Sequence, residues 1–181
     1  SGVSIHVFDL TALRGERAAL EAEASPDERA RAARLRDPAH RERFVRRRGA
    51  LRRLLAAQTG ASPRDVRFVA GYGGKPLLAD AGLCFSPSSS GDVFVVALSA
   101  THDVGVDVER VLPRADLDDV ARHVFPAPVV ARLRALDDDA RLAAFYRVWT
   151  LEEAVGKLDG RGIAEGTPLA DVPLDALTRD G

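Results

Sequence analysis

The sequence lacks several residue types, and each absence narrows the possible functions. The single cysteine, Cys84, excludes a disulfide within this chain and a cysteine-based zinc site, and it fits a reducing cytosol. The longest apolar run, Val93 to Leu98, is too short to span a bilayer, and no signal peptide is visible. We therefore expect a cytoplasmic protein with no membrane partner. A net charge of −1 also argues against a dedicated nucleic-acid binder.

Lysine is almost absent as well. Among 26 basic residues only Lys75 and Lys157 are lysines, and methionine and asparagine do not occur. A lysine retained against this background can indicate a need for a compact ammonium on a flexible stem, which arginine does not supply. Chance is the alternative, and the two lysines alone do not decide between them.

What is present suits a globular fold. The 181 residues, 46% hydrophobic and 29% charged, can form one domain or two small halves that share a core. Hydrophobic spacing and breakers predict helices at 11–36 (interrupted at 25–27), 39–58, 117–123, 127–136 and 139–158, strands at 3–10, 66–70, 83–85, 93–98 and 104–108, and a mostly loop-like tail at 160–181. Helices grouped apart from short strands predict an α+β architecture.

Two carboxylates stand two residues apart in the predicted strand around Gly105–Glu109. Strand residues two apart share a face at roughly 6 to 7 Å, so Asp107 and Glu109 would lie together. Adjacent like charges favour a cation between them, and hard oxygen ligands suit Mg²⁺. The alternative is a solvated edge strand.

Three residues lie four apart on the last predicted helix, so Trp149, Glu153 and Lys157 share one face. An ordinary surface pair of glutamate and lysine, with the tryptophan in the core, is the alternative reading.

Two further segments could bind phosphate. The serine-rich stretch 85–92 offers hydroxyl donors, although a polar hairpin loop explains the stretch better when it is taken alone. The arginines between Arg41 and Arg53 could form a phosphate clamp, an RNA-binding face or a solvated helix face; with Phe44 as their only aromatic neighbour, RNA is disfavoured.

Taken in order, these segments resemble the phosphopantetheinyl transferases of the surfactin-synthetase-activating type. That family shows an arginine-bearing helix, a G-K-P turn, an F-x-x-S-H-S loop, a G-x-D-x-E strand, and a W-x-x-K-E-x-x-x-K helix followed by G-x-G. The corresponding segments here are 43–52, 74–76, 85–90, 105–109, 149–157 and 160–162. Each motif is weak alone, but five in order with sensible gaps are specific.

The resemblance implies transfer of the phosphopantetheine arm of coenzyme A to a serine of an acyl or peptidyl carrier protein, with release of 3′,5′-ADP. It implies Mg²⁺ bound by Asp107, Glu109 and Glu153, with Glu153 also helping to take the serine proton and Lys157 near the reacting phosphate. Coenzyme A contacts are implied for Arg43, Arg48, Lys75, Pro76, Ser88 and Ser89. The implied fold is two similar α+β halves, here 1–104 and 105–181, with the site between them.

The sequence departs from the family pattern at several points. The histidine of S-H-S is Ser89, the lysine before Glu153 is Glu152, and a frequent family glutamate falls at Val129. Only 19 residues follow Gly162, so we expect a second half that is short at its C-terminus. These departures leave open an alternative: a relative that binds a carrier protein or coenzyme A without turnover.

Overall fold

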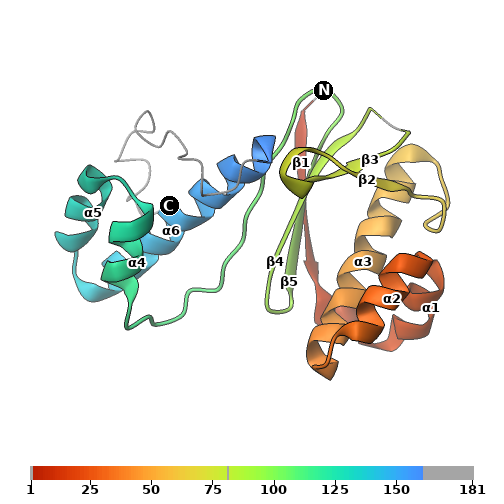
Figure 1. Cartoon of the computed structure of the whole chain (residues 1–181), viewed down its shortest axis with the longest axis horizontal. Coiled ribbons are helices and arrows are strands. Elements are labelled where there is room, and N and C mark those ends of the chain that lie inside the picture. The colour runs from red at the N-terminus through yellow and green to blue at the C-terminus, as the bar shows by residue number, and fades with distance from the viewer. Residues whose placement is uncertain (1, 81, 161–181) are drawn as a thin grey trace.

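The structure, a computed structural model, describes residues 2–80 and 82–160. Figure 1 shows two groups of elements: a sheet covered by helices α1 to α3, and a helical group formed by α4 to α6. The segment 100–116 joins them, and α6 runs back from the helical group to the sheet (Figure 1). The site described below forms where this helix returns.

A three-stranded antiparallel sheet centres the first group. Its strands are β1 (Val3–Asp9), β4 (Cys84–Ser90) and β5 (Val93–Ser99), in the order β1-β5-β4. The hairpin between β4 and β5 turns at Gly91, whose φ of 60° lies in the left-handed region that favours glycine. Because β4 is an edge strand, it tolerates Pro87 and leaves one edge for other contacts.

Helices cover one face of this sheet. After the 3-10 helix η1 (Leu10–Glu16) come α1 (Arg17–Glu23), α2 (Pro26–Arg34) and α3 (Pro38–Thr59). The long helix α3 packs Leu51 and Leu55 against Phe85, Phe94 and Val96 of the sheet. A short ribbon of β2 (Phe68–Ala70) and β3 (Pro76–Leu78), joined through η2 (Tyr72–Gly74), lies beside it.

The second group has its own core. It consists of α4 (Leu117–Val124), α5 (Ala127–Arg134) and α6 (Asp138–Asp159). Phe125, Leu133, Phe145 and Val148 are buried together, and Trp149 stacks on Phe145 with ring centroids 5.9 Å apart. The tryptophan is therefore a packing residue at the edge of this core.

The α+β prediction is confirmed, and the predicted helices appear within a few residues of their expected ends. Two predictions are wrong. Residues 104–108 form no strand in the described structure, and the serine stretch is a strand up to Ser90 with only a two-residue turn after it. The strand β3 was not predicted. The expected loop-like tail, including Gly162, lies outside the described residues.

No helix in the described part of the chain combines the length and the apolar character needed to cross a membrane.

Candidate functional site

Side chains of the serine-rich stretch alternate between the two faces of strand β4. Phe85 is fully buried against α3, and Ser89 lines a cavity on that same face. Ser86, Ser88 and Ser90 point to the opposite face and contact the segment that follows the sheet. This alternation follows from the two-residue period of a strand.

Serine hydroxyls hold the segment 105–110 beside the sheet. The hydroxyl of Ser86 accepts a hydrogen bond from the backbone N–H of Val106 (3.2 Å), and that of Ser90 accepts one from the N–H of Arg110 (3.0 Å). Side chains therefore satisfy backbone donors that a neighbouring strand would otherwise bind. The segment can therefore lie beside the sheet without the predicted strand ladder.

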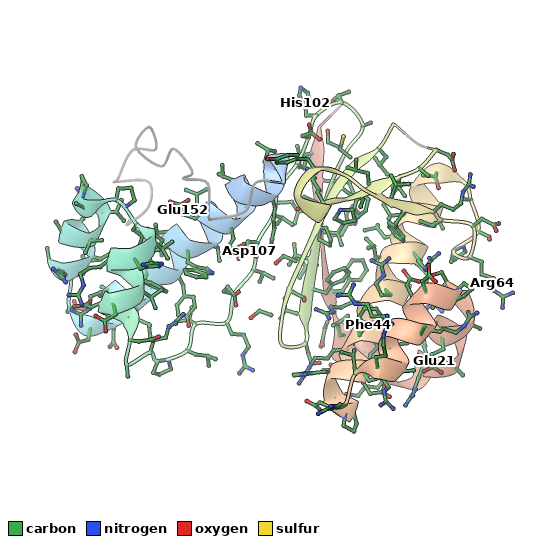
Figure 2. All side chains as sticks on the ribbon, in the orientation of Figure 1. Glu21, Phe44, Arg64, His102, Asp107 and Glu152 are labelled. Atoms are coloured by element: carbon green, nitrogen blue, oxygen red, sulfur yellow. The ribbon has the colours of Figure 1, made fainter. Side chains whose placement is uncertain are left out.

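Asp107 lies at the centre of this contact (Figure 2). Its side chain is only 3% exposed, and its Oδ1 accepts hydrogen bonds from Ser88 Oγ (2.6 Å) and Lys157 Nζ (2.5 Å). The same ammonium also donates to Ser88 Oγ at 3.0 Å. The second oxygen, Oδ2, is buried and has no hydrogen-bond partner among the described residues. A buried carboxylate oxygen without a partner is unfavourable, and a cation ligand would relieve it.

Two further carboxylates, Glu109 and Glu153, belong to the same region of the structure. Ser90 Oγ donates to Glu109 Oε2 at 2.8 Å, which fixes Glu109 on the same side of β4. Burial raises the pKa of Glu153; the carboxylates of Asp107 and Glu109 raise it further, while Lys157 lowers it. Glu153 therefore interacts electrostatically with Asp107 and Glu109, the other two expected metal ligands.

The charges of these side chains favour a bound cation, but their positions do not form a coordination shell. Within residues 2–80 and 82–160, no three Asp, Glu, His or Cys side chains are grouped closely enough to hold an ion. The unsatisfied oxygen of Asp107 and the raised pKa of Glu153 are nevertheless what a hard divalent cation would stabilise. The donor set suits Mg²⁺, with side-chain adjustment required.

Glu152 belongs to a different face of α6. It is 3% exposed and lies four residues after the fully buried Val148, so it continues the buried face of the helix. Glu153 and Lys157, which are partly exposed, lie on the neighbouring face. The departure from the family pattern at Glu152 therefore concerns the packing of α6 more than the charge beside Lys157.

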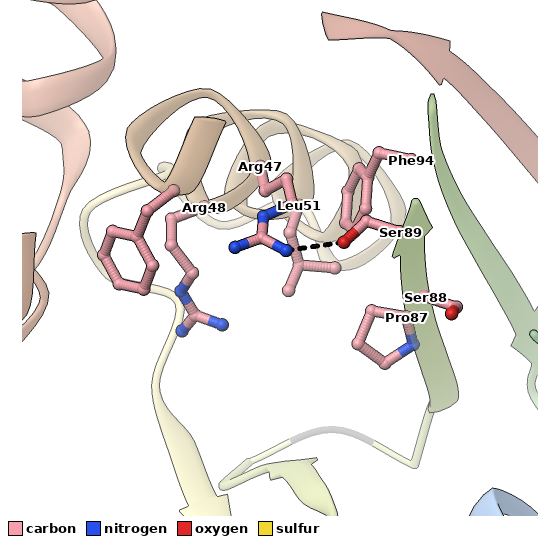
Figure 3. Close-up of a pocket in the computed structure, with 8 residues that line it drawn as sticks. Arg47, Arg48, Leu51, Pro87, Ser88, Ser89 and Phe94 are labelled. Carbon is pink, nitrogen blue, oxygen red and sulfur yellow. Dashed lines mark hydrogen bonds between the residues drawn. The ribbon is translucent and has the colours of Figure 1, made fainter. Parts of the chain in front are cut away.

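A cavity of about 160 Å³ lies on the other face of β4, between this strand and α3 (Figure 3). Arg47 Nη1 donates to Ser89 Oγ at 2.5 Å across it. Burial lowers the pKa of Arg47, and the positive charges of Arg31, Arg43 and Arg48 lower it further. Such a concentration of guanidinium groups favours a bound anion.

The other arginines of this region have protein partners. Arg48 pairs with Glu28 and lies over the Phe68 ring at 4.4 Å, although it also lines the cavity. Arg43 pairs with Asp92 at 3.2 Å and lines an adjoining cavity of about 370 Å³. Of the expected coenzyme A contacts, Ser88 faces Asp107 and Ser89 faces the arginines.

Arg47 was not predicted as a site residue, although the sequence held a signal for it. It lies four residues after Arg43 and four before the buried Leu51, so all three share the helix face turned toward the sheet. Arg48 is one position round the helix and turns toward α2.

Lys75 and Pro76 line a third cavity of about 230 Å³, which is also lined by Gly156, Lys157 and Gly160 at the end of α6. The expected G-K-P turn thus lies at the same helix end as Lys157. Gly162, the last residue of the expected G-x-G, lies outside the described part of the chain.

Because Glu153 is only partly buried, we expect Glu153→Gln to raise the Tm of the metal-free protein near neutral pH by less than the 2–4 °C that about 1 kcal/mol represents in a chain of this size. A raised pKa means that the folded state binds more protons than the unfolded state, so wild-type stability falls as the pH rises above about 4.3. Glutamine removes that cost. Thermal unfolding in EDTA should show a gain at about pH 7 that vanishes near pH 4, while Glu21→Gln shows none; a lower Tm at neutral pH would contradict this account.

The sequence of this chain is similar to those of several known proteins. A sequence model described as the 4′-phosphopantetheinyl transferase superfamily matches residues 103–180. The 4′-phosphopantetheinyl transferase HetI of Nostoc sp. is 39% identical over 150 residues, which are 81% of this chain and 63% of that protein. A putative 4′-phosphopantetheinyl transferase of Synechocystis sp. is 35% identical over 78% of this chain and 59% of its own length.

A more distant relative is the 4′-phosphopantetheinyl transferase Sfp of Bacillus subtilis, 26% identical over 71% of this chain and 53% of its own length. This chain therefore spans less than two thirds of each of these three relatives.

Proposed function

We propose that this chain transfers the phosphopantetheine arm of coenzyme A to a serine of an acyl or peptidyl carrier protein, because it is similar to the 4′-phosphopantetheinyl transferase superfamily over residues 103–180 and, over 81% of its own length, to HetI. The observation that carries the proposal is the contact of Lys157 with Asp107 and Ser88 beside β4, with Glu153 one helical turn before Lys157 on α6. On the opposite face of the strand lies the arginine-lined cavity around Arg47. Acidic and basic sites beside one strand suit a metal and a polyphosphate.

The proposed reaction is a phosphoryl transfer. The serine oxygen of the carrier protein forms a bond to the β-phosphorus of coenzyme A, and the bond from that phosphorus to the leaving 3′,5′-ADP breaks. Glu153 accepts the serine proton, a role that its raised pKa favours because a base is most effective when its pKa approaches the working pH. Lys157 turns from Asp107 to the pyrophosphate, where its ammonium offsets negative charge.

Asp107, Glu109 and Glu153 are the proposed Mg²⁺ ligands, and the ion would offset the charge on the phosphates when bound. Ser90 orients Glu109, and Ser88 orients Asp107, each through one hydroxyl hydrogen bond. The two serines therefore act on the reaction through the carboxylates that they hold.

The proposed coenzyme A contacts are Arg43, Arg47, Arg48 and Ser89, together with the backbone, and not the ammonium, of the turn formed by Lys75 and Pro76. The cavities on either side of β4 support this assignment because basic or polar groups line them. A phosphate group would give the closely spaced guanidinium groups a counter-charge.

The proposed architecture divides the chain into halves at 1–104 and 105–181, related by pseudo-symmetry, with the second half short. Separate hydrophobic cores support the division: one cluster joins residues between Phe8 and Leu98, and another joins residues between Leu117 and Leu151. The site lies where α6 of the second half meets the sheet of the first.

The test is direct. The protein would be incubated with Mg²⁺, coenzyme A and a panel of apo carrier proteins, and intact mass spectrometry would detect addition of one phosphopantetheine group. Addition that EDTA prevents supports the transferase. Coenzyme A binding without addition to any carrier would instead support a relative that binds without turnover, a reading favoured by Ser89 in place of the family histidine.

Arg47→Leu should separate the basic cavity from the rest of the site. A charge-assisted hydrogen bond contributes about 1.5–3 kcal/mol, so its loss should raise KM for coenzyme A about tenfold to a hundredfold with little change in kcat. Arg53→Leu is the matched control, since Arg53 lies on the same helix and pairs with Glu16 and Glu23 away from the cavity. An equal effect of both variants on KM would show that the cavity around Arg47 does not bind coenzyme A.

A further inference from the structure

The two lysines of the chain meet at the end of α6. Lys157 belongs to the last turn of this helix, and Lys75 reaches the same turn from the loop before β3. Lys75 Nζ donates to the carbonyl of Leu158 at 2.6 Å and to the carbonyl of Val104 at 3.2 Å. Its side chain is only 11% exposed.

These two carbonyls belong to the two segments that carry the site. Leu158 directly follows Lys157, and the last four carbonyls of a helix have no partner within it, so a lysine ammonium can satisfy one of them. Val104 lies three residues before Asp107, at the start of the segment held by the serines. One ammonium therefore joins the helix that presents Lys157 to the segment that presents Asp107.

We propose that Lys75 is a positioning residue, which fastens the end of α6 and the start of the 104–110 segment to the same turn and so sets the contact between Lys157 and Asp107. Its effect on catalysis rests on the proposed function. Its effect on the helix end and on the contact does not. This role differs from a side-chain contact to the nucleotide, which would require Lys75 to leave both carbonyls.

The surrounding backbone supports this role because two glycines allow it to lie directly against the end of α6. A Cβ on Gly73, whose φ is 59°, would run into the carbonyl of Gly160. A Cβ on Gly105 would likewise run into the carbonyl of Ala154. The backbone at Gly73, directly before the G-K-P turn, and the backbone at Gly105 therefore both pack against the end of α6.

The chemistry of the anchor explains why it is a lysine in a chain rich in arginine. An ammonium has three donors at one point; here two carbonyls accept hydrogen bonds from it, and the carboxylate of Asp103 lies 3.8 Å away as an ion-pair partner. A planar guanidinium directs its donors outward in a fork and would match this convergent arrangement poorly.

The test uses hydrogen exchange on the ligand-free protein. In Lys75→Met, which keeps the length of the stem but not the charge, amides at the end of α6 should exchange about tenfold faster, the effect of losing one charged hydrogen bond. Arg67→Met is the control, because Arg67 is exposed and pairs only at the surface with Asp80. Exchange unchanged from wild type would overturn the proposal.

Amine labelling gives a second measurement that needs no variant. Since the chain has only two lysines, peptide mass spectrometry can follow each ammonium separately. In wild type, Lys75 should react more slowly than Lys157, which is 32% exposed, and added coenzyme A should not change the rate at Lys75. Faster labelling of Lys75, or its protection by coenzyme A, would assign the side chain to the nucleotide instead.

In Lys75→Met, Lys157 should also be labelled faster than in wild type, because its partner Asp107 is no longer held in place. If the protein proves inactive on every carrier, these exchange and labelling results still decide the positioning role. If it is active, Lys75→Met should lower kcat more than it raises KM for coenzyme A, with partial recovery in Lys75→Arg; a change in KM alone would contradict the proposal.

Discussion

Asp107→Asn is expected to lower kcat for phosphopantetheine transfer about a hundredfold or more while the protein remains folded. The amide has the same shape as the carboxylate, and its oxygen can still accept from Ser88 and Lys157. What it loses is the negative charge that a divalent cation requires. Charge stabilisation by a bound metal contributes several kcal/mol to phosphoryl transfer, and each 1.36 kcal/mol is a factor of ten in rate.

The experiment should measure the metal separately from turnover. Titration with Mn²⁺, followed by electron paramagnetic resonance, reports binding whether or not a carrier protein is modified. Asp116→Asn is the control, because Asp116 is exposed and pairs with Arg114 in the connecting segment. Full activity with unchanged metal binding in Asp107→Asn would show that the buried aspartate serves packing and not the metal.

The helices could be predicted from the sequence because their signals are local. Asp37 before Pro38 and Gly60 at the far end delimit α3, and the same kinds of residue delimit α6. The strands were harder. The run from Ser86 to Ser90 lacks apolar alternation because one of its faces contacts the polar segment 105–110, so its composition resembled that of a loop.

The partners of the site residues could not be predicted, because they depend on long-range contacts. The sequence placed Asp107 and Glu109 together, yet only the structure shows that Ser88 and Lys157 share one oxygen of Asp107 and leave the other unsatisfied. Helical spacing could likewise not reveal which arginine is already paired. Glu28, which lies on another helix, engages Arg48 and not Arg47.

Glu28→Gln should cause the largest loss of stability. The Glu28 carboxylate accepts from Arg52 Nε at 2.7 Å, from Arg48 Nε at 2.6 Å and from the backbone N–H of Ser25 at 2.9 Å. The side chain of Arg52 is 3% exposed, so the variant leaves a buried cation without its counter-charge. Breaking a buried ion pair costs about 3–5 kcal/mol, which for a chain of this size is a fall in Tm of about 10 °C.

Unfolding in urea, followed by circular dichroism, would measure this loss. The matched control is Glu21→Gln, because Glu21 makes an exposed pair with Arg17 one helical turn away, and exposed pairs contribute about 1 kcal/mol at most. Equal losses in the two variants would mean that the buried pair contributes no more than a surface one.

The pH dependence of this loss should run opposite to that at Glu153. Burial alone raises the pKa of Glu28, but hydrogen bonds from Arg52 and Ser25 and the charge of Arg48 outweigh it, so the net shift is downward. A lowered pKa gives stability that is present above about pH 4.3 and is lost as the pH falls through the folded pKa. At neutral pH the wild type should be more stable than Glu28→Gln and less stable than Glu153→Gln. Both differences in unfolding free energy should disappear in acid, where the two carboxyl groups are protonated. The carboxylate that fixes the arginine helix adds stability at neutral pH, and the one beside Asp107 lowers it until a cation binds.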